Sequence, residues 1–168
     1  MKGDGMMSME KVKAYFAQFG MEQRVLEFEV SSATVELAAQ AAGVEPKRIA
    51  KTLSFSLHGA PLVIVMAGDA RIDNHAYKEW FGAKAKMLTP DETLAMVGHP
   101  VGGVCPFAVN DGVTVYLDES LRRFDTVFPA CGSGNSAIEL TLPELERYAG
   151  NPAWVDVCKG WRADAETP

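Results

Sequence analysis

Residues Arg48 to Leu57 read RIAKTLSFSL, and from Lys51 onward apolar and polar side chains alternate with a period of two. Such alternation predicts a β-strand with one half-buried face. Lys51 stands at the head of the apolar row that Leu53 and Phe55 continue. A strand residue cannot change faces unless the whole register slips. We therefore expect the Lys51 side chain to enter the molecule on the core side.

Two interpretations of Lys51 follow from this placement. A buried ammonium costs on the order of several kcal/mol unless it is paired. In the first interpretation, Lys51 lies at the mouth of the strand and its ammonium extends to water. In the second, Lys51 lies at the floor of a pocket and binds an anionic or carbonyl oxygen.

Composition indicates one domain and limits the partners. A chain of 168 residues with 48% hydrophobic residues can bury a core of its own. We expect a flexible tail over residues 1–8 and a single domain over residues 9–168. No apolar run approaches the roughly 20 residues that span a bilayer, so no membrane partner is expected. The net charge of −6 argues against a broad nucleic-acid-binding face but is compatible with binding of a few terminal nucleotides.

The cysteines predict the compartment. Three widely spaced cysteines suit neither a disulfide framework nor a zinc ribbon, and no secretory signal is visible at the N-terminus. A reducing cytoplasm is therefore the expected location.

Helix and strand signals alternate irregularly along the chain. Helices are expected from Met9 to Phe19, from a cap within Ser31–Thr34 to Gly43, after Asp73 with Trp80 buried, and at capping boxes that begin at Thr89 and Thr141. Further strands are expected at residues 25–30, 61–67, 84–88, 113–117, 125–131, 137–140 and 154–157. This order predicts the α+β class, with a mixed sheet surrounded by helices rather than a doubly wound one.

Two glycine turns could carry chemistry. Gly102 and Gly103 lie in a loop rich in glycine and proline, where adjacent glycines let backbone N–H groups point at a ligand oxygen. The turn of Gly132, Ser133 and Gly134 follows a predicted strand and supplies further amides and a hydroxyl. A plain tight turn and a plain hairpin or bulge, respectively, explain the same residues. Neither turn has the spacing of a phosphate-loop or dinucleotide fingerprint.

Other reactive side chains have simpler explanations. Cys105 could act as a nucleophile, but no histidine and carboxylate pair stands out to activate it, and isolated cysteines are usually small buried hydrophobes. Asp69, Asp73 and His75 could bind a metal, although Asp73 is more simply a helix cap. We expect neither a metal nor a cofactor. His99, in the glycine-rich loop, is expected to be solvated.

The order of these motifs resembles the YbaK/prolyl-tRNA synthetase-associated domain family of trans-editing aminoacyl-tRNA deacylases. The matching segments are Arg48–Leu53, Gly98–Phe107 and Ala130–Ser133, and the similarity extends from about Val12 to Ala149. The resemblance implies a mixed, partly barrel-like sheet with flanking helices. It also implies hydrolysis of the ester between a wrongly attached small amino acid and the 3′-terminal adenosine, with a tRNA(Pro)-type substrate expected.

The resemblance also implies roles for particular residues. The family's essential lysine corresponds to Lys51, its glycine loop to Gly102 and Gly103, and its later turn to Gly132 and Ser133. Their neighbours are expected to bind substrate, namely Thr52, Val101, Cys105 and Gly134. Cys105, Phe107 and Cys131 depart from or vary within the family pattern, which leaves the identity of the amino acid open.

Partners and alternatives follow from the same resemblance. The expected partner is the 3′ end of an aminoacyl-tRNA, and prolyl-tRNA synthetase is a second expected partner. One alternative is a non-catalytic module that binds tRNA or nucleotides beside that synthetase. Another is a sequence-nonspecific DNA-binding protein, which the acidic charge and the lack of a basic recognition helix disfavour.

Overall fold

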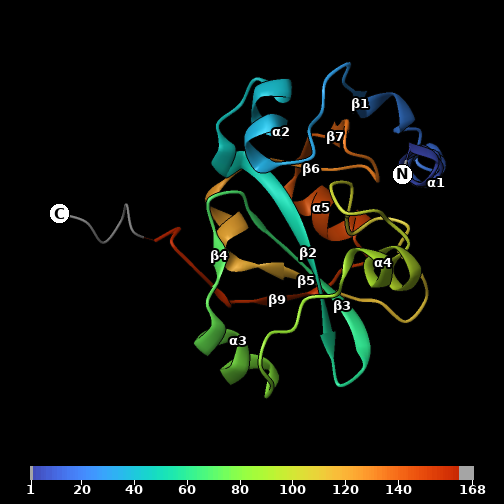
Figure 1. The fold of residues 1–168 in the computed structure, drawn as a ribbon. Coiled ribbons are helices and arrows are strands. Elements are labelled where there is room, and N and C mark those ends of the chain that lie inside the picture. The colour runs from blue at the N-terminus through green and yellow to red at the C-terminus, as the bar shows by residue number, and fades with distance from the viewer. Residues whose placement is uncertain (1, 163–168) are drawn as a thin grey trace.

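A computed structural model describes residues 2–162, of which residues 2–6 are described by their backbone alone. The segment around Lys51 forms β2 (Ile49–Leu57), which pairs antiparallel with β3 (Ala60–Ala67), as predicted. This hairpin occupies the centre of a six-stranded sheet in the order β8-β6-β2-β3-β5-β9 (Figure 1). The outer strands are β5 (Thr114–Asp118), β6 (Thr126–Pro129), β8 (Leu140–Thr141) and β9 (Ala153–Val155).

The sheet mixes both pairing directions and curls into a half-barrel. β6 runs parallel to β2, and β5 and β9 continue parallel beyond β3, whereas β8 is antiparallel to β6. The predicted α+β class is therefore confirmed. Two small sheets complete it: β1 (Val25–Glu27) pairs with β7 (Ser136–Ile138), and β4 (Arg71–Ile72) pairs with β10 (Cys158–Lys159).

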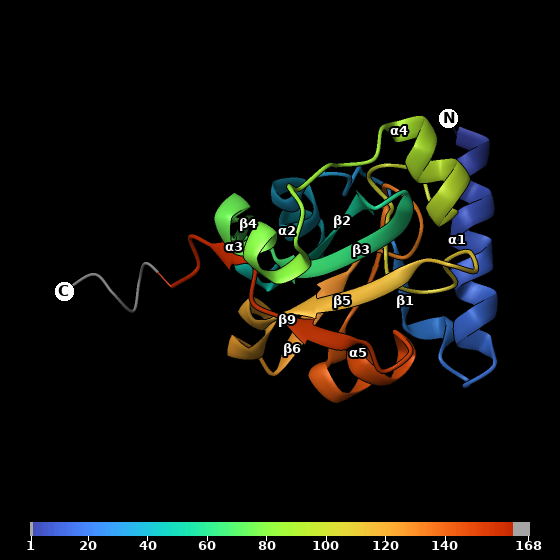
Figure 2. The same ribbon diagram turned by 90° about the horizontal axis from the view of Figure 1, so that it is seen from below.

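Helices cover the sheet, and most begin at the predicted caps. Thr34, Asp73, Thr89 and Thr141 each accept a backbone N–H from the first turn that follows. Figure 2 shows α1 lying across one end of the sheet and α5 alongside β9 and β5. The helices are α1 (Lys2–Ala17), α2 (Val35–Ala42), α3 (Asn74–Phe81), α4 (Pro90–Glu92), the π-helical η3 (Thr93–Val97) and α5 (Leu142–Tyr148). Short 3₁₀ turns are η1 (Glu22–Arg24), η2 (Pro46–Arg48) and η4 (Glu119–Arg123).

Several local predictions differ from the structure. α1 begins at Lys2, so residues 2–8 form helix where a tail was expected, and Ser8 at the end of this stretch is buried. Trp80 is 53% exposed because α3 turns Tyr77 into the core instead. No strand forms at residues 84–88, where a single bridge joins Met87 to Phe55.

One large apolar core joins the sheet to α1. Phe16 and Phe107 contact each other edge to face, with ring centroids 4.8 Å apart. The Tyr15 hydroxyl donates to the Tyr148 carbonyl at 2.7 Å, which connects α1 to α5. α1 therefore supports both α5 and the glycine-rich loop that ends at Phe107. Within the described chain, no helix combines the length and apolar character needed to cross a bilayer.

A buried histidine fixes the same loop. His99 is fully buried rather than solvated as predicted, and its Nε2 lies 2.7 Å from the Phe107 carbonyl oxygen. Because a carbonyl can only accept, Nε2 carries the proton, and Nδ1 accepts from the Ser8 hydroxyl on α1. Burial lowers the pKa of His99 to about 4. The neutral ring thus holds the loop to α1.

This histidine should make stability depend on pH. An unfolded histidine has a pKa of about 6.5, so below that pH the unfolded chain binds a proton that the folded chain excludes. Stability is therefore lost as the pH falls from about 6.5 towards 4. We expect His99 to lower the free energy of unfolding by about 2 kcal/mol between about pH 7.5 and about pH 5, measured by urea denaturation.

Two variants isolate the contribution of His99. His99→Gln should remove this part of the pH dependence, because glutamine offers a donor and an acceptor but does not titrate. His58→Gln changes an exposed histidine and should leave the dependence as in the wild type. Equal pH profiles for the wild type and His99→Gln would contradict the assignment.

Candidate active site

One edge of β2, the edge opposite β3, lacks a neighbouring strand over part of its length. β6 pairs with β2 only at Ile49 and Ala50. Further along the same edge, the Leu88 N–H donates to the Ser54 carbonyl at 3.0 Å, and the Ser56 N–H donates to the Lys86 carbonyl. Between these two contacts, no described segment pairs with this edge of β2.

Thr52 occupies the middle of this opening. Main-chain groups along a strand point alternately to its two edges, so Thr52 presents its N–H and C=O to the same edge as Ser54 and Ser56. Its hydroxyl is also buried without a hydrogen-bond partner. Buried polar groups in proteins are nearly always paired, so a residue with its polar groups free here indicates a place for a ligand or water.

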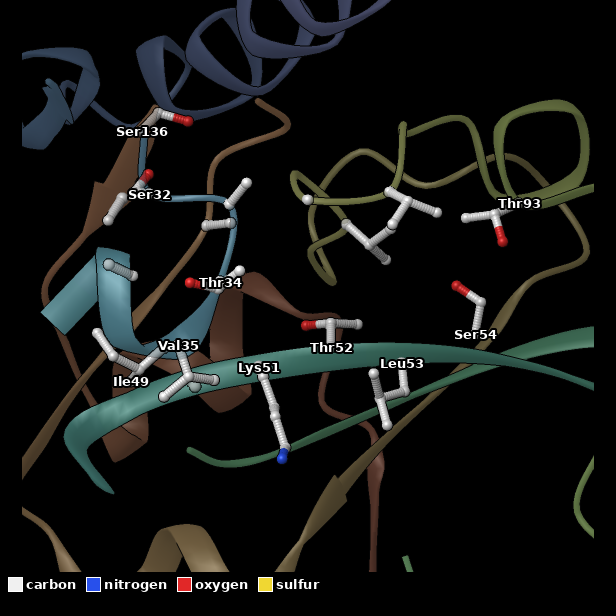
Figure 3. Close-up of a pocket in the computed structure, with 18 of the residues that line it drawn as sticks. Ser32, Thr34, Val35, Ile49, Lys51, Thr52, Leu53, Ser54, Thr93 and Ser136 are labelled. Atoms are coloured by element: carbon white, nitrogen blue, oxygen red, sulfur yellow. The ribbon is translucent and has the colours of Figure 1, made fainter. Parts of the chain in front are cut away.

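A cavity of about 310 Å³ fills the opening. Its walls are β2, the residues that lead into α2, the glycine-rich loop and the segment that follows β6 (Figure 3). Most of the lining is apolar. Apart from Lys51, the polar lining side chains are hydroxyls, namely Ser32, Thr34, Thr52, Ser54, Thr93 and Ser136.

Three of these hydroxyls make no hydrogen bond within the described chain. Ser32, Thr52 and Ser54 are buried, and their side-chain oxygens have no partner. Figure 3 shows the Ser54 hydroxyl rising from β2 and the Thr93 hydroxyl pointing down from the segment above that strand. The cavity is therefore equipped to form hydrogen bonds that the protein itself does not satisfy.

Lys51 is the only ionisable residue among the described lining residues. Figure 3 shows that Lys51 and Leu53 leave β2 on the opposite side from Thr52 and Ser54, which confirms the predicted row. Lys51 is half-buried, and this desolvation lowers its pKa, although Asp69 is among the groups that oppose the shift. Its ammonium therefore lies at the margin of the cavity rather than among the hydroxyls.

The two loop glycines have different surroundings. Gly102 lines the cavity with a φ of 95°, and a Cβ there would lie 3.2 Å from the Ala33 Cβ. Gly103 does not line the cavity, and its N–H donates to the Pro100 carbonyl at 3.0 Å. A Cβ on Gly103 would lie 2.4 Å from the Ser133 nitrogen. Gly103 thus lets two loops touch, while Gly102 leaves its amide free beside the cavity.

The remaining residues expected at the site also divide into one that lines the cavity and others that do not. Val101 lines the cavity and is exposed, whereas Gly132, Ser133 and Gly134 do not line it. The Ser133 hydroxyl lies 2.7 Å from that of Ser136, so it supports a lining residue.

Cys105 is remote from the cavity. It is fully buried, does not line the cavity, and burial raises the pKa of its thiol to about 12. Its sulfur lies 3.5 Å from the His99 Nε2. A thiol that stays protonated behind the wall cannot serve as a nucleophile in this cavity.

Sequence reasoning missed most of the hydroxyls. Ser54 shares the row of Thr52, so the period of two could have identified it. Ser32 and Ser136 come from distant segments that meet only in the fold, and Thr93 follows a capping box without any motif of its own. Asp73 accepts from the His75 and Ala76 amides as a helix cap, and the described residues contain no cluster of three potential metal ligands.

Comparison with known proteins identifies the family. The family model for the aminoacyl-tRNA editing domain matches residues 29–148. Uncharacterized protein YwhH of Bacillus subtilis (strain 168) is 54% identical over 156 residues, which is 92% of this chain and 99% of that protein. A proline--tRNA ligase of Geobacillus thermodenitrificans (strain NG80-2) is 27% identical over 109 residues, which is 64% of this chain but only 19% of the ligase.

Solved structures agree with the sequence relatives. A crystal structure described as "a putative trans-editing enzyme for prolyl tRNA synthetase" superimposes with a TM-score of 0.81 at 28% identity, covering 91% of this chain and 98% of the other. The family match includes β2, its open edge and the Gly102 loop. The chain therefore belongs to the aminoacyl-tRNA editing domain family.

Proposed function

We propose that this protein is a trans-editing deacylase, which hydrolyses the ester between a small, wrongly attached amino acid and the 3′-terminal adenosine of a tRNA(Pro)-type substrate. The observation that carries the proposal is the unpaired edge of β2 inside a cavity of about 310 Å³. Family membership and the structural likeness to a protein described as a trans-editing enzyme support it. A tRNA substrate would place the reaction in the cytoplasm.

The main chain supplies the groups that an ester requires. The Thr52 N–H and the Gly102 N–H flank the cavity, where they stabilise the carbonyl oxygen as it becomes an oxyanion. One such donor is typically worth about 3 kcal/mol in the transition state. The Thr52 carbonyl, on the same edge, accepts a hydrogen bond from the α-amino group. The acyl group thus lies along β2 much as a short neighbouring strand would.

The chemical step uses water and the substrate itself. No carboxylate or imidazole lines the cavity within the described chain. Water therefore adds to the ester carbonyl carbon while the neighbouring ribose hydroxyl relays its proton. The bond from the carbonyl carbon to the ribose oxygen breaks, and that oxygen takes the proton. The products are the free amino acid and an uncharged tRNA end.

Lys51 supplies charge at the margin of the cavity. No described carboxylate lies within ion-pair distance of its ammonium. In our proposal it binds a phosphate of the terminal nucleotides, which suits a chain of net charge −6 that makes few phosphate contacts. Prolyl-tRNA synthetase is the partner we expect to supply further contacts to the tRNA.

The lack of a side-chain base favours one alternative, a module that binds the tRNA end without hydrolysing it. A panel of tRNA(Pro) esters separates the two functions. We expect at least one ester of a small amino acid to decay about tenfold or more faster with the protein than in buffer, and the phenylalanyl ester to be spared because the cavity is small. Decay of every ester at the buffer rate would leave only the binding module.

Removing the charge of Lys51 should weaken substrate binding. We expect Lys51→Ala to raise KM about tenfold at low salt, since one lost phosphate contact is worth roughly 1.4 kcal/mol, and the deficit should shrink as salt screens the charge. Lys51→Arg should keep most of the affinity.

Lys47→Ala provides the matched control. Lys47 lies in η2, outside the cavity lining, and pairs with Glu45 at 3.5 Å. The same change of charge there should alter KM by less than about twofold. A Lys51→Ala variant with the wild-type KM and salt dependence would remove Lys51 from substrate binding.

A further inference from the structure

The hydroxyls at one end of the cavity indicate which side chain the substrate carries. We propose that Ser54 and Thr93 bind the side-chain hydroxyl of the esterified amino acid, so that the preferred substrate carries a short hydroxyl amino acid such as serine rather than alanine. This inference rests on the proposed deacylase function and assigns its substrate class.

The first support is the unsatisfied state of the Ser54 hydroxyl, with Thr93 buried beside it. The Ser54 side chain is 5% exposed, and its oxygen has no partner within the described chain. Thr93 is 2% exposed, and Figure 3 shows its hydroxyl pointing down towards β2 above Ser54. A buried hydroxyl without a partner destabilises a protein, whereas a ligand that bonds to it recovers the loss. A methyl side chain, as in alanine, would leave the Ser54 hydroxyl unsatisfied.

The second support is the enclosure of this end of the cavity. Leu88 is attached to β2 by its N–H bond to the Ser54 carbonyl, and both residues are buried. The tRNA must remain outside, so only the free end of the acyl group can reach Ser54 and Thr93. That free end consists of the α-amino group and the amino-acid side chain.

The third support decides between these two groups. An α-ammonium buried against neutral hydroxyls would be costly, and no carboxylate lines the described cavity to offset its charge. The Thr52 carbonyl on the open edge already offers the amino group an acceptor. A hydroxyl both donates and accepts, so it can complete the bonding of Ser54 and Thr93 together. A thiol would do so only weakly.

Binding of non-hydrolysable analogues tests the inference directly. The probes are 3′-amino-3′-deoxyadenosine amides of serine and of alanine, with dissociation constants measured by calorimetry. We expect the wild type to bind the seryl amide about tenfold or more tightly than the alanyl amide. In Ser54→Ala and Thr93→Val this ratio should fall below about threefold, with little change for the alanyl amide.

Ser56→Ala is the matched control, because Ser56 lies in the same row of β2 but does not line the cavity. It should keep the wild-type preference. Ser54→Ala removes an unpartnered hydroxyl, so its melting temperature should not fall below that of the wild type. If either site variant fails to fold, the comparison of the two amides in the wild type still tests the preference for serine over alanine.

Equal or weaker binding of the seryl amide by the wild type would overturn the inference. Parallel hydrolysis of seryl- and alanyl-tRNA(Pro) keeps the two proposals apart. Equally fast hydrolysis of both esters would overturn the serine preference while the deacylase function stands. Tighter seryl-amide binding, with every ester of the tRNA(Pro) panel decaying at the buffer rate, would support the site assignment and overturn the deacylase function.

Discussion

The structure is organised around a strand that lacks a neighbour for part of its length. β2 changes partners along one edge, from β6 at Ala50 to the segment before α4 at Ser54, and the main chain between them stays unpaired. Buried N–H and C=O groups are costly when they bind nothing. The surrounding elements therefore cannot close over this edge, and the cavity exists because they stand back from it.

The loop opposite this edge is held from behind rather than from the cavity. His99 joins it to α1, and Gly103 lets it touch the turn at Ser133 without an intervening side chain. Both contacts are buried and leave Gly102 and Val101 at the cavity. Such support matters because a hydrogen-bond donor contributes to catalysis only when its position is fixed before the reaction begins. A residue can thus be essential to the site without lining it.

The sequence was most informative where local physics decides the outcome. Alternation around Lys51 correctly placed the strand and its two rows. The caps at Asp73, Thr89 and Thr141, and the run of candidate caps that ends at Thr34, correctly placed helix starts. These features depend on nearby residues alone. The resemblance to an editing family added the fold, which the comparisons confirm.

Prediction failed where distant segments determine the environment. The row with Thr52 and Ser54 is the polar one, yet it is more buried than Lys51 because α2 and the glycine-rich loop cover it. His99 was expected in solvent because its loop is rich in glycine, but Ser8 on α1 encloses it. Periodicity reports which side chains share a face and says nothing of what lies against that face.

The recessed position of the open edge has a consequence for the protein's behaviour in a crowded cell. Unpaired strand edges at a surface recruit other chains and promote aggregation. Here the free stretch extends only from Lys51 to Leu53 and lies within a cavity of about 310 Å³ between α2 and the Gly102 loop. The protein can therefore offer strand-like hydrogen bonding to a small ligand while keeping this edge from pairing with another polypeptide.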